Sequence, residues 1–145
     1  MEVREVMTSN VRLATPDQSI SESARIMAEC DSGVVPVYED DRLVGMVTDR
    51  DIVVRAVAHD LSPDTPVRQV MSQEVLYCYE DEDIEQVAKN MAKNQIRRLP
   101  VLNRSKRLVG IVSIGDLSKN VRPHATGEAI AEISQPGGQH SQRPH

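Results

Sequence analysis

The sequence predicts an α/β fold of the α+β class, built from two copies of one unit that pack about a pseudo-twofold axis. Three observations support this prediction. The segment GMVTDRD, Gly45 to Asp51, returns as GIVSIGD, Gly110 to Asp116. Each copy closes a unit of roughly 60 residues, which exceeds the usual period of solenoids and propellers. Short β-branched stretches, typical of strands, alternate with stretches whose apolar residues have helical spacing.

The repeat sets the predicted domain organisation. It opens with VREVM at Val3 and VRQVM at Val67, and the register between the copies shifts by one residue after the VVPVY and RRLPV stretches. A half of this length buries too little surface alone, so we expect the two copies to pack together. The predicted boundaries are a first repeat over 1–60, a linker over 61–66, a second repeat over 67–122 and a tail over 123–145.

The elements of the first copy follow from its apolar spacing and turn residues. Residues 3–7 fit one helical turn, and 11–14 alternate as a half-buried strand does. Ser19 followed by Glu22 has the form of a capping box before a helix. The remaining predicted elements are a helix over 20–29 with Ile20, Ala24, Met27 and Ala28 on one face, strands over 34–38 and 43–47, and a helix over 49–58 with Ile52, Val53 and Ala56 as its apolar stripe.

The second copy repeats this order. The predicted elements are a strand over 75–79, a helix over 84–94 opened by Asp83 and Gln86, strands over 98–102 and 108–113, and a helix over 114–120. From 134 onward the sequence is rich in Gly, Pro, Gln and Ser and has almost no apolar residue to anchor it. We therefore expect a disordered tail.

Composition argues against several classes of function. The net charge of -5, with no Phe or Trp and only three Tyr, makes nucleic-acid binding a poor prediction, because such surfaces need clustered basic or aromatic side chains. No apolar run approaches the ~20 residues of a membrane span, and the opening lacks the apolar core of a signal peptide. We expect a cytoplasmic protein. We do not expect an enzyme, because the sequence offers no Ser/His/Asp or Cys/His arrangement and no carboxylate set with a metal. Cys30 and Cys78 fit no metal-ligand spacing, which predicts two reduced, partly buried thiols and no metal site.

Two hydroxyl–carboxylate pairs mark the start of the last helix of each copy. Thr48 with Asp51, and Ser113 with Asp116, place a hydroxyl at a strand end and an acid three residues later. In a structural interpretation both pairs are capping boxes. In a functional interpretation the junction faces a phosphate, and the carboxylate accepts both hydrogen bonds of a ribose diol, as in a nucleotide site. The spacing leaves both interpretations open.

Together these motifs resemble a tandem CBS-domain pair, also called a Bateman module, of the stand-alone prokaryotic type. The resemblance rests on VREVM, on the VVPVY and RRLPV strands, and on the paired GMVTDRD and GIVSIGD motifs; it covers about Val3 to Asn120. It implies two βαββα units with two clefts between them. In many relatives these clefts bind AMP, ADP, ATP, NAD-type cofactors or S-adenosylmethionine.

The resemblance also implies two unequal sites. In such pairs, the residues just before the LPV-type strand of one unit can contact phosphate in the cleft whose ribose-binding acid comes from the other unit. Arg97 and Arg98 hold this place in the second copy, whereas the first has Gly33 and Val34. The alternative for both arginines is a solvated strand edge. The expected residues are Thr48, Arg50, Asp51, Arg97 and Arg98 in site 1, Ser113 and Asp116 in site 2, and Val11, Val35, Pro36, Val75, Leu99 and Pro100 around the adenine.

The expected function is therefore a regulatory module that binds an adenosine-containing nucleotide and signals to an effector protein of unknown identity, with no obligatory cofactor. The alternative is a structural dimerisation module whose cleft is empty or holds a metal. Relatives form a flat disc of four units through the helices that follow each hairpin. Apolar residues on these helices, Ile52, Val53, Val57 and Leu117, predict a homodimer of this kind.

Overall fold

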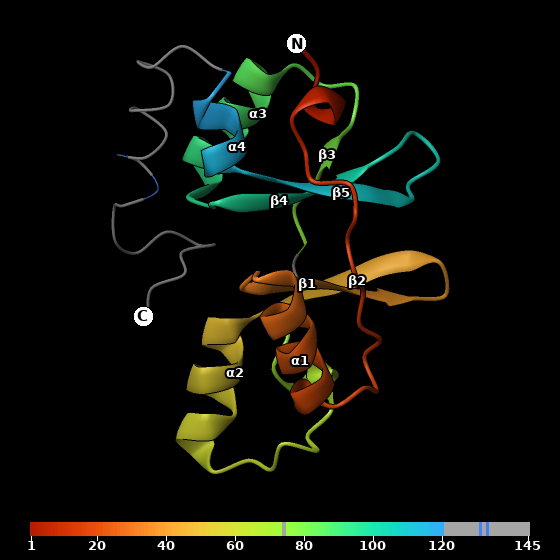
Figure 1. The fold of residues 1–145 in the computed structure, drawn as a ribbon, viewed down its shortest axis with the longest axis vertical. Helices are drawn as coiled ribbons and strands as arrows, with labels where there is room; N and C mark the ends of the chain where they lie inside the picture. The colour runs from red at the N-terminus through yellow and green to blue at the C-terminus, as the bar shows by residue number, and fades with distance from the viewer. Residues whose placement is uncertain (74, 121–130, 132, 134–145) are drawn as a thin grey trace. The chain divides into compact units, whose positions relative to one another are not determined.

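The chain folds into two compact units. The computed structural model describes residues 1–73, 75–120, 131 and 133 (Figure 1). One unit is Val11–Val75, and it holds helices α1 and α2; we call it the α1–α2 unit. The other combines Met1–Asn10 with the described residues from Leu76 onward and holds helices α3 and α4; we call it the α3–α4 unit. Both units mix strands and helices, which confirms the predicted α+β class.

The α1–α2 unit is a β-hairpin covered on one face by two helices (Figure 1). Its elements are α1 (Ile20–Cys30), β1 (Val34–Glu39), β2 (Arg42–Thr48), α2 (Asp49–Arg55) and the 3-10 helices η2 (Val57–His59) and η3 (Val67–Gln69). The strands pair antiparallel, from Val34 with Thr48 to Glu39 with Arg42. Asp40 and Asp41 turn the chain at φ 53° and 62°, the left-handed backbone that suits the right-handed twist of a tight hairpin.

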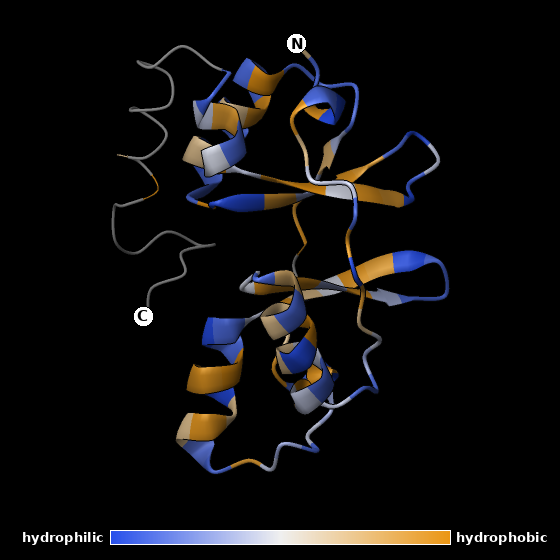
Figure 2. Cartoon of the chain, viewed as in Figure 1, coloured by the Kyte–Doolittle hydropathy of each residue, from blue (hydrophilic) through white to orange (hydrophobic). Residues whose placement is uncertain are grey.

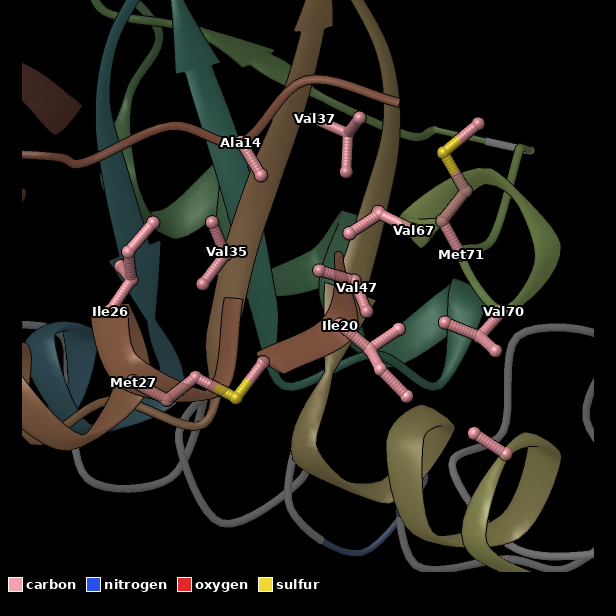
Figure 3. Close-up of a cluster of buried hydrophobic side chains, with 11 residues drawn as sticks. Ala14, Ile20, Ile26, Met27, Val35, Val37, Val47, Val67, Val70 and Met71 are labelled. Carbon is pink, nitrogen blue, oxygen red and sulfur yellow. The ribbon is translucent and has the colours of Figure 1, made fainter. Parts of the chain in front are cut away.

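The core of the α1–α2 unit is aliphatic. Figure 3 shows its side chains converging from the inner face of α1, from both strands and from η3. The labelled members are Ala14, Ile20, Ile26, Met27, Val35, Val37, Val47, Val67, Val70 and Met71. Since no Phe or Trp is present, the unit depends on close packing of small branched side chains, and each buried methylene group contributes roughly 0.8 kcal/mol.

The α3–α4 unit repeats this plan with one more strand. Its elements are the 3-10 helix η1 (Val3–Glu5), β3 (Cys78–Tyr79), α3 (Ile84–Asn94), β4 (Arg98–Leu102), β5 (Leu108–Ser113) and α4 (Ile114–Ser118). β3 pairs parallel with β4, and β4 pairs antiparallel with β5. The helix over 84–94 and the strands over 98–102 and 108–113 have the predicted bounds.

The compact units are offset from the sequence repeats. The opening segment of each repeat packs in the unit of the other repeat: Thr8 exchanges two backbone hydrogen bonds of 2.9 Å with Ile111, and Ser72 exchanges bonds of 2.8 and 3.0 Å with Met46. Each contact passes a glycine of the repeated motif. An added Cβ would meet backbone oxygen 2.7 Å away at Gly110 and 2.8 Å away at Gly45. Glycine is therefore required where these segments cross.

Several predicted elements are shorter than expected or expose other residues. The strand predicted over 11–14 is reduced to one parallel bridge between Ala14 and Val37, and the strand over 75–79 to β3. On α1 the prediction that Ala24 and Ala28 belong to the buried face is wrong, since both are exposed; Ser23 and Ile26 are buried instead. Apolar type alone misled here, because alanine is tolerated on either face of a helix.

The helices after the hairpins also differ from expectation. α2 ends at Arg55, before the predicted 58, and Val53 is exposed rather than part of a buried stripe. Leu117, predicted as a surface residue for dimer contacts, is fully buried in the core of its own unit. At the start of α3, the Asp83 carboxylate accepts a bond from the Glu85 N–H, and the predicted capping role of Gln86 is not seen.

Two predictions concern the ends of the units. The predicted linker over 61–66 is held against the start of α1, where Ile20 N–H donates to the Thr65 carbonyl over 2.9 Å. The predicted tail over 123–145 lies outside the described residues except at Ala131 and Ile133, which are helical. In the described part of the chain, no helix has the length and apolar character of a membrane span.

Candidate functional site

The two predicted hydroxyl–carboxylate pairs form the same strand-to-helix junction in each unit. Thr48 ends β2 with extended backbone; its Oγ1 accepts from Asp51 N–H over 3.0 Å, and Asp51 Oδ2 accepts from Thr48 N–H over 2.9 Å. Ser113 and Asp116 make the equivalent bonds of 3.1 and 2.9 Å. Both pairs are thus reciprocal capping boxes, which satisfy helix donors that would otherwise lack partners.

Capping uses only one oxygen of each carboxylate. Asp51 Oδ1 lies 3.8 Å from Arg55 Nε, and the Asp51 side chain is 17% exposed. The Asp116 residue is likewise half-buried, and its capping bond is made by Oδ2. An ionised carboxylate offers about four acceptor positions. Each acid can therefore cap its helix and still accept hydrogen bonds from a hydroxyl-bearing ligand.

The residues before the first hairpin strand are tied to the same junctions. The Gly33 carbonyl accepts from Asp49 N–H, and the Arg97 carbonyl accepts from Ile114 N–H, both over 2.9 Å. A Cβ on Gly33 would lie 2.8 Å from Asp49 Oδ2, so the aspartate occupies the space that a side chain at Gly33 would need. The backbone of Arg97 thus belongs to the junction of its own unit.

The charges around the two junctions differ. Arg97 and Arg98 are exposed, and neither has an ion-pair partner among the residues that the structure describes. Arg50 is also exposed, on the first turn of α2. Asp49, which we did not include among the site residues, lies beside Gly33 where the second repeat has Ile114. The contrast between DRD and IGD in the repeated motif was the signal for it.

The predicted adenine-pocket residues divide into two groups. Val35 and Leu99 belong to the hydrophobic cores of their units, and Pro36 and Pro100 are also buried, on the neighbouring strand positions. Val11 and Val75 are only half-buried. The latter two keep apolar surface that a flat ligand could cover.

In the described part of the chain, the cysteines and the acidic side chains form neither a metal site nor a reactive thiol. Burial, together with the nearby Glu82 carboxylate, raises the pKa of the Cys78 thiol to about 12; the thiol therefore stays protonated and unreactive at neutral pH. Cys30 is exposed rather than partly buried, and both cysteines are free. Within residues 1–73 and 75–120, together with 131 and 133, no group of three or more His, Cys, Asp or Glu side chains could hold a metal ion.

The fold and the paired junctions define a tandem α+β module with one capped strand-to-helix junction in each half. The sequence profile of the CBS domain matches residues 3–57 and 67–123. The chain belongs to the CBS domain family, and the resemblance noted from its motifs is confirmed.

Similar proteins support this assignment. The CBS domain-containing protein YhcV of Bacillus subtilis is 40% identical over 133 residues, which cover 91% of this chain and 94% of YhcV. Hypoxic response protein 1 of Mycobacterium tuberculosis is 33% identical over 92% of this chain and 94% of its own length. A crystal structure of Hypoxic Response Protein I with two coordinated zinc ions matches with a TM-score of 0.74, 32% identity, and coverage of 84% of this chain and 100% of that one.

A further solved structure contains adenosine compounds. It is the CBS domain pair of protein MJ0100 in complex with 5′-methylthioadenosine and S-adenosyl-L-methionine. It matches with a TM-score of 0.73 and 29% identity, covering 82% of this chain and 94% of that one.

Proposed function

We propose that this protein is a non-catalytic regulatory module that binds an adenosine-containing ligand and passes the binding event to a partner protein. The family, and the adenosine compounds bound by the MJ0100 domain pair, support the ligand class. The candidate ligands are AMP, ADP, ATP, NAD-type cofactors and S-adenosylmethionine. Signalling requires that the ligand bind two conformations of the module with different affinity.

The observation that carries this proposal is the carboxylate at each junction. Asp51 and Asp116 are fixed by their capping bonds through Oδ2, so Oδ1 is held in place to accept hydrogen bonds from a ribose diol. The hydroxyl oxygens of Thr48 and Ser113 accept hydrogen bonds from the backbone N–H groups of Asp51 and Asp116, which fixes the first turn of each helix. A carboxylate held in this way has little entropy to lose on binding, which favours ligand affinity.

The two sites should differ in their preference for phosphate. Following the family resemblance, we assign Arg97, Arg98 and Arg50 to the site of Asp51. Guanidinium groups donate paired hydrogen bonds to phosphate oxygens and keep their charge at any physiological pH. Because Arg97 and Arg98 are exposed, they are available to a phosphate. The Asp51 site should therefore bind phosphate-bearing ligands more tightly than the Asp116 site.

Calorimetric titration of AMP, ATP, NAD and S-adenosylmethionine tests the proposal. Asp51→Ala should weaken the tighter site about tenfold to a hundredfold, because loss of a charged hydrogen-bonding partner costs roughly 1.5–3 kcal/mol. Asp116→Ala should affect only the weaker site. Asp64→Ala, which removes an exposed acid of the same unit outside the junction, is the matched control and should bind as the unaltered protein does.

Both substitutions also remove half of a capping box, so thermal melting without ligand must accompany each titration. Asp51→Asn separates the two roles, since its amide oxygen can still accept the backbone bond while the negative charge is lost. If Asp51→Ala lowers the melting temperature and leaves every ligand affinity intact, the acid is only a cap and the site assignment fails.

A structural dimerisation module whose cleft is empty or holds a metal is the second candidate. The zinc ions in the hypoxic response protein structure favour it, whereas the absence of a suitable ligand group among the described side chains argues against a metal here. A melting temperature that rises with zinc and with no nucleotide would support this candidate. Action as a homodimer is part of our proposal; the cytoplasmic location stays a prediction of the sequence.

A further inference from the structure

A row of basic side chains lies along and after α3. The exposed residues of this helix are Gln86, Lys89 and Lys93, and their spacing of three and four residues places them on one face of the helix. Arg97 and Arg98, both exposed, follow the turn that ends the helix, and Figure 2 shows that β4 is hydrophilic where it begins. We call Lys89, Lys93, Arg97 and Arg98 the basic face.

The charge of the basic face is not neutralised within the described structure. The stretch 86–115 contains seven Lys and Arg residues and no Asp or Glu, although the net charge of the chain is -5. None of the four cations belongs to an ion pair among the described residues, whereas five arginines elsewhere in the chain do. The helix dipole favours a cation only in the last turn of α3, which holds Lys93. It therefore does not account for the other three.

The first repeat shows that the fold does not require the basic face. Glu29, Gly33 and Val34 occupy the positions that match its last three cations, and Arg25 occupies the position of Lys89. Glu29 is itself paired with an arginine of its own unit. The same helix and hairpin thus form without cations at three of these positions, so the basic face calls for an explanation specific to the second repeat.

We propose that the basic face docks an acidic helical segment of a partner protein, and that a phosphate-bearing ligand competes with this segment for Arg97 and Arg98. The inference rests on the proposed function and deepens it, because it names a surface for the partner and the way in which ligand binding is passed on. Lys89 and Lys93 stay available when the ligand is bound. The ligand therefore weakens docking without abolishing it.

The spacing of the basic face fits a helix. Lys89 and Lys93 are one helical turn apart, a rise of about 6 Å along α3. Acidic side chains four residues apart on a partner helix repeat at the same distance, so two helices that lie side by side can pair both lysines. Arg97 is four residues after Lys93, and its Cα can lie at most about 14 Å further on. One partner segment of about four helical turns can therefore reach all four cations.

An acidic protein segment fits this surface better than a nucleic acid does. The stretch 86–115 contains no aromatic residue, so unpaired bases would find no side chain to stack on. The acidic run over 80–83 also precedes α3, and it would repel a long polyanion that extends past the basic face. A short acidic helix ends before it meets this repulsion.

Fluorescence anisotropy of a labelled peptide tests docking. The probe is an alanine-based peptide of about 15 residues, long enough to be helical, with glutamate at every fourth position; its glutamine counterpart should not bind. Lys89→Ala with Lys93→Ala should weaken binding of the glutamate peptide to the full chain about tenfold, and Lys89→Arg with Lys93→Arg should preserve it. Arg25→Ala with Arg42→Ala, which removes the same charge from exposed positions of the α1–α2 unit, is the control. It should bind the peptide as the unaltered chain does.

ATP and adenosine, each added at constant ionic strength, test the shared arginines. Saturating ATP should weaken binding of the glutamate peptide about tenfold, because its phosphates occupy Arg97 and Arg98. Adenosine has no phosphate and should leave peptide binding unchanged. Arg97→Gly with Arg98→Val should weaken the peptide about as much as ATP does and should reduce the further effect of ATP.

Four results would each overturn the proposal. These are a glutamate peptide that fails to bind, a glutamine peptide that binds equally well, ATP that leaves peptide affinity unchanged, and a thymidine oligonucleotide that binds more tightly than the peptide at the same salt concentration. Calorimetric titration of ATP without peptide separates this inference from the proposed function. If ATP binds but does not compete, only this inference fails; if ATP does not bind, the proposed function fails as well.

Discussion

The junctions at the ends of β2 and β5 have the same backbone hydrogen bonds but different chemical surroundings. Each is closed by a reciprocal hydroxyl–carboxylate cap and by a bond from the residue after the hydroxyl to the strand start. Around this frame the side chains differ: the α2 junction has Asp49 beside Gly33 and Arg50 on the first turn of its helix, whereas the α4 junction has Ile114, Gly115 and Arg97 at the matching positions. The two junctions thus hold Asp51 and Asp116 with the same geometry. They differ in the neighbouring side chains, which would determine the ligand that each site prefers.

The close contact between the motif glycine and the crossing backbone is nearly the same in the two units: Gly45 lies against Ser72, and Gly110 lies against Thr8. Gly45→Ala and Gly110→Ala should each lower the unfolding free energy by about 1–3 kcal/mol or more, because the new methyl group would overlap the backbone of the crossing segment. Urea denaturation measures both. Gly115→Ala is the control. Its added Cβ would lie 3.5 Å from Ser113 Oγ, an ordinary van der Waals distance, so this substitution should be tolerated. Tolerance at only one of the first two glycines would mean that the crossings are not equivalent.

Arg97 and Arg98 should account for most of the difference between the two sites in their preference for phosphate-bearing ligands. Arg97→Gly with Arg98→Val gives the second repeat the residues of the first, and should weaken ATP binding about tenfold while leaving adenosine nearly unchanged. Titration of both ligands checks this. Lys89→Ala with Lys93→Ala removes the same charge from exposed positions on α3. If this control loses as much ATP affinity, overall charge rather than position is responsible.

A buried hydroxyl distinguishes α1 from α3. Ser23 is fully buried, and its Oγ has no hydrogen-bond partner in the described structure, whereas the matching residue of α3 is Val87, a core residue. Ser23→Val should raise the unfolding free energy by about 1 kcal/mol, since it replaces an unpaired buried hydroxyl with apolar contacts.

Denaturant titration measures this effect, and Ser23→Ala serves as the control that removes the hydroxyl without adding a methyl group. Lower stability in both variants would show that the hydroxyl has a bonding role that the structure does not reveal.

The smallest expected difference concerns two matching aspartates. Arg104 donates one hydrogen bond to each carboxylate oxygen of Asp81, whereas Arg68 donates two hydrogen bonds to a single oxygen, Oδ1, of Asp17. The hydrogen bonds from Arg104 hold the pKa of Asp81 below its ordinary value of 3.8. A lowered carboxyl pKa contributes stability above the unfolded-state value, and this contribution disappears as the pH falls through the folded-state value.

Arg104→Ala should therefore cost stability at neutral pH, and the cost should shrink below about pH 4. Urea midpoints across this range check the expectation. Arg68→Ala is the comparison in the other unit. A loss for Arg104→Ala that is independent of pH would instead point to the contact between its guanidinium and the Tyr79 ring, 4.0 Å from the centroid.

The sequence by itself determined the features that depend on neighbours a few residues away. Capping boxes join positions three residues apart, and the hairpins join strands through short turns, so Thr48, Asp51 and the bounds of β4 and β5 could be read from spacing. The repeat also identified the family, because two copies of one motif in the same order carry more information than either alone.

Only the tertiary structure decided which surfaces are covered. It placed each opening segment in the unit of the other repeat, through backbone pairing between residues far apart in sequence. Only the structure shows that Leu117 is buried, that Val53 is exposed and that Arg104 is the hydrogen-bonding partner of Asp81. Apolar periodicity shows that a helix has an inner face, but burial of a particular side chain depends on what packs there, and that is set by long-range contacts.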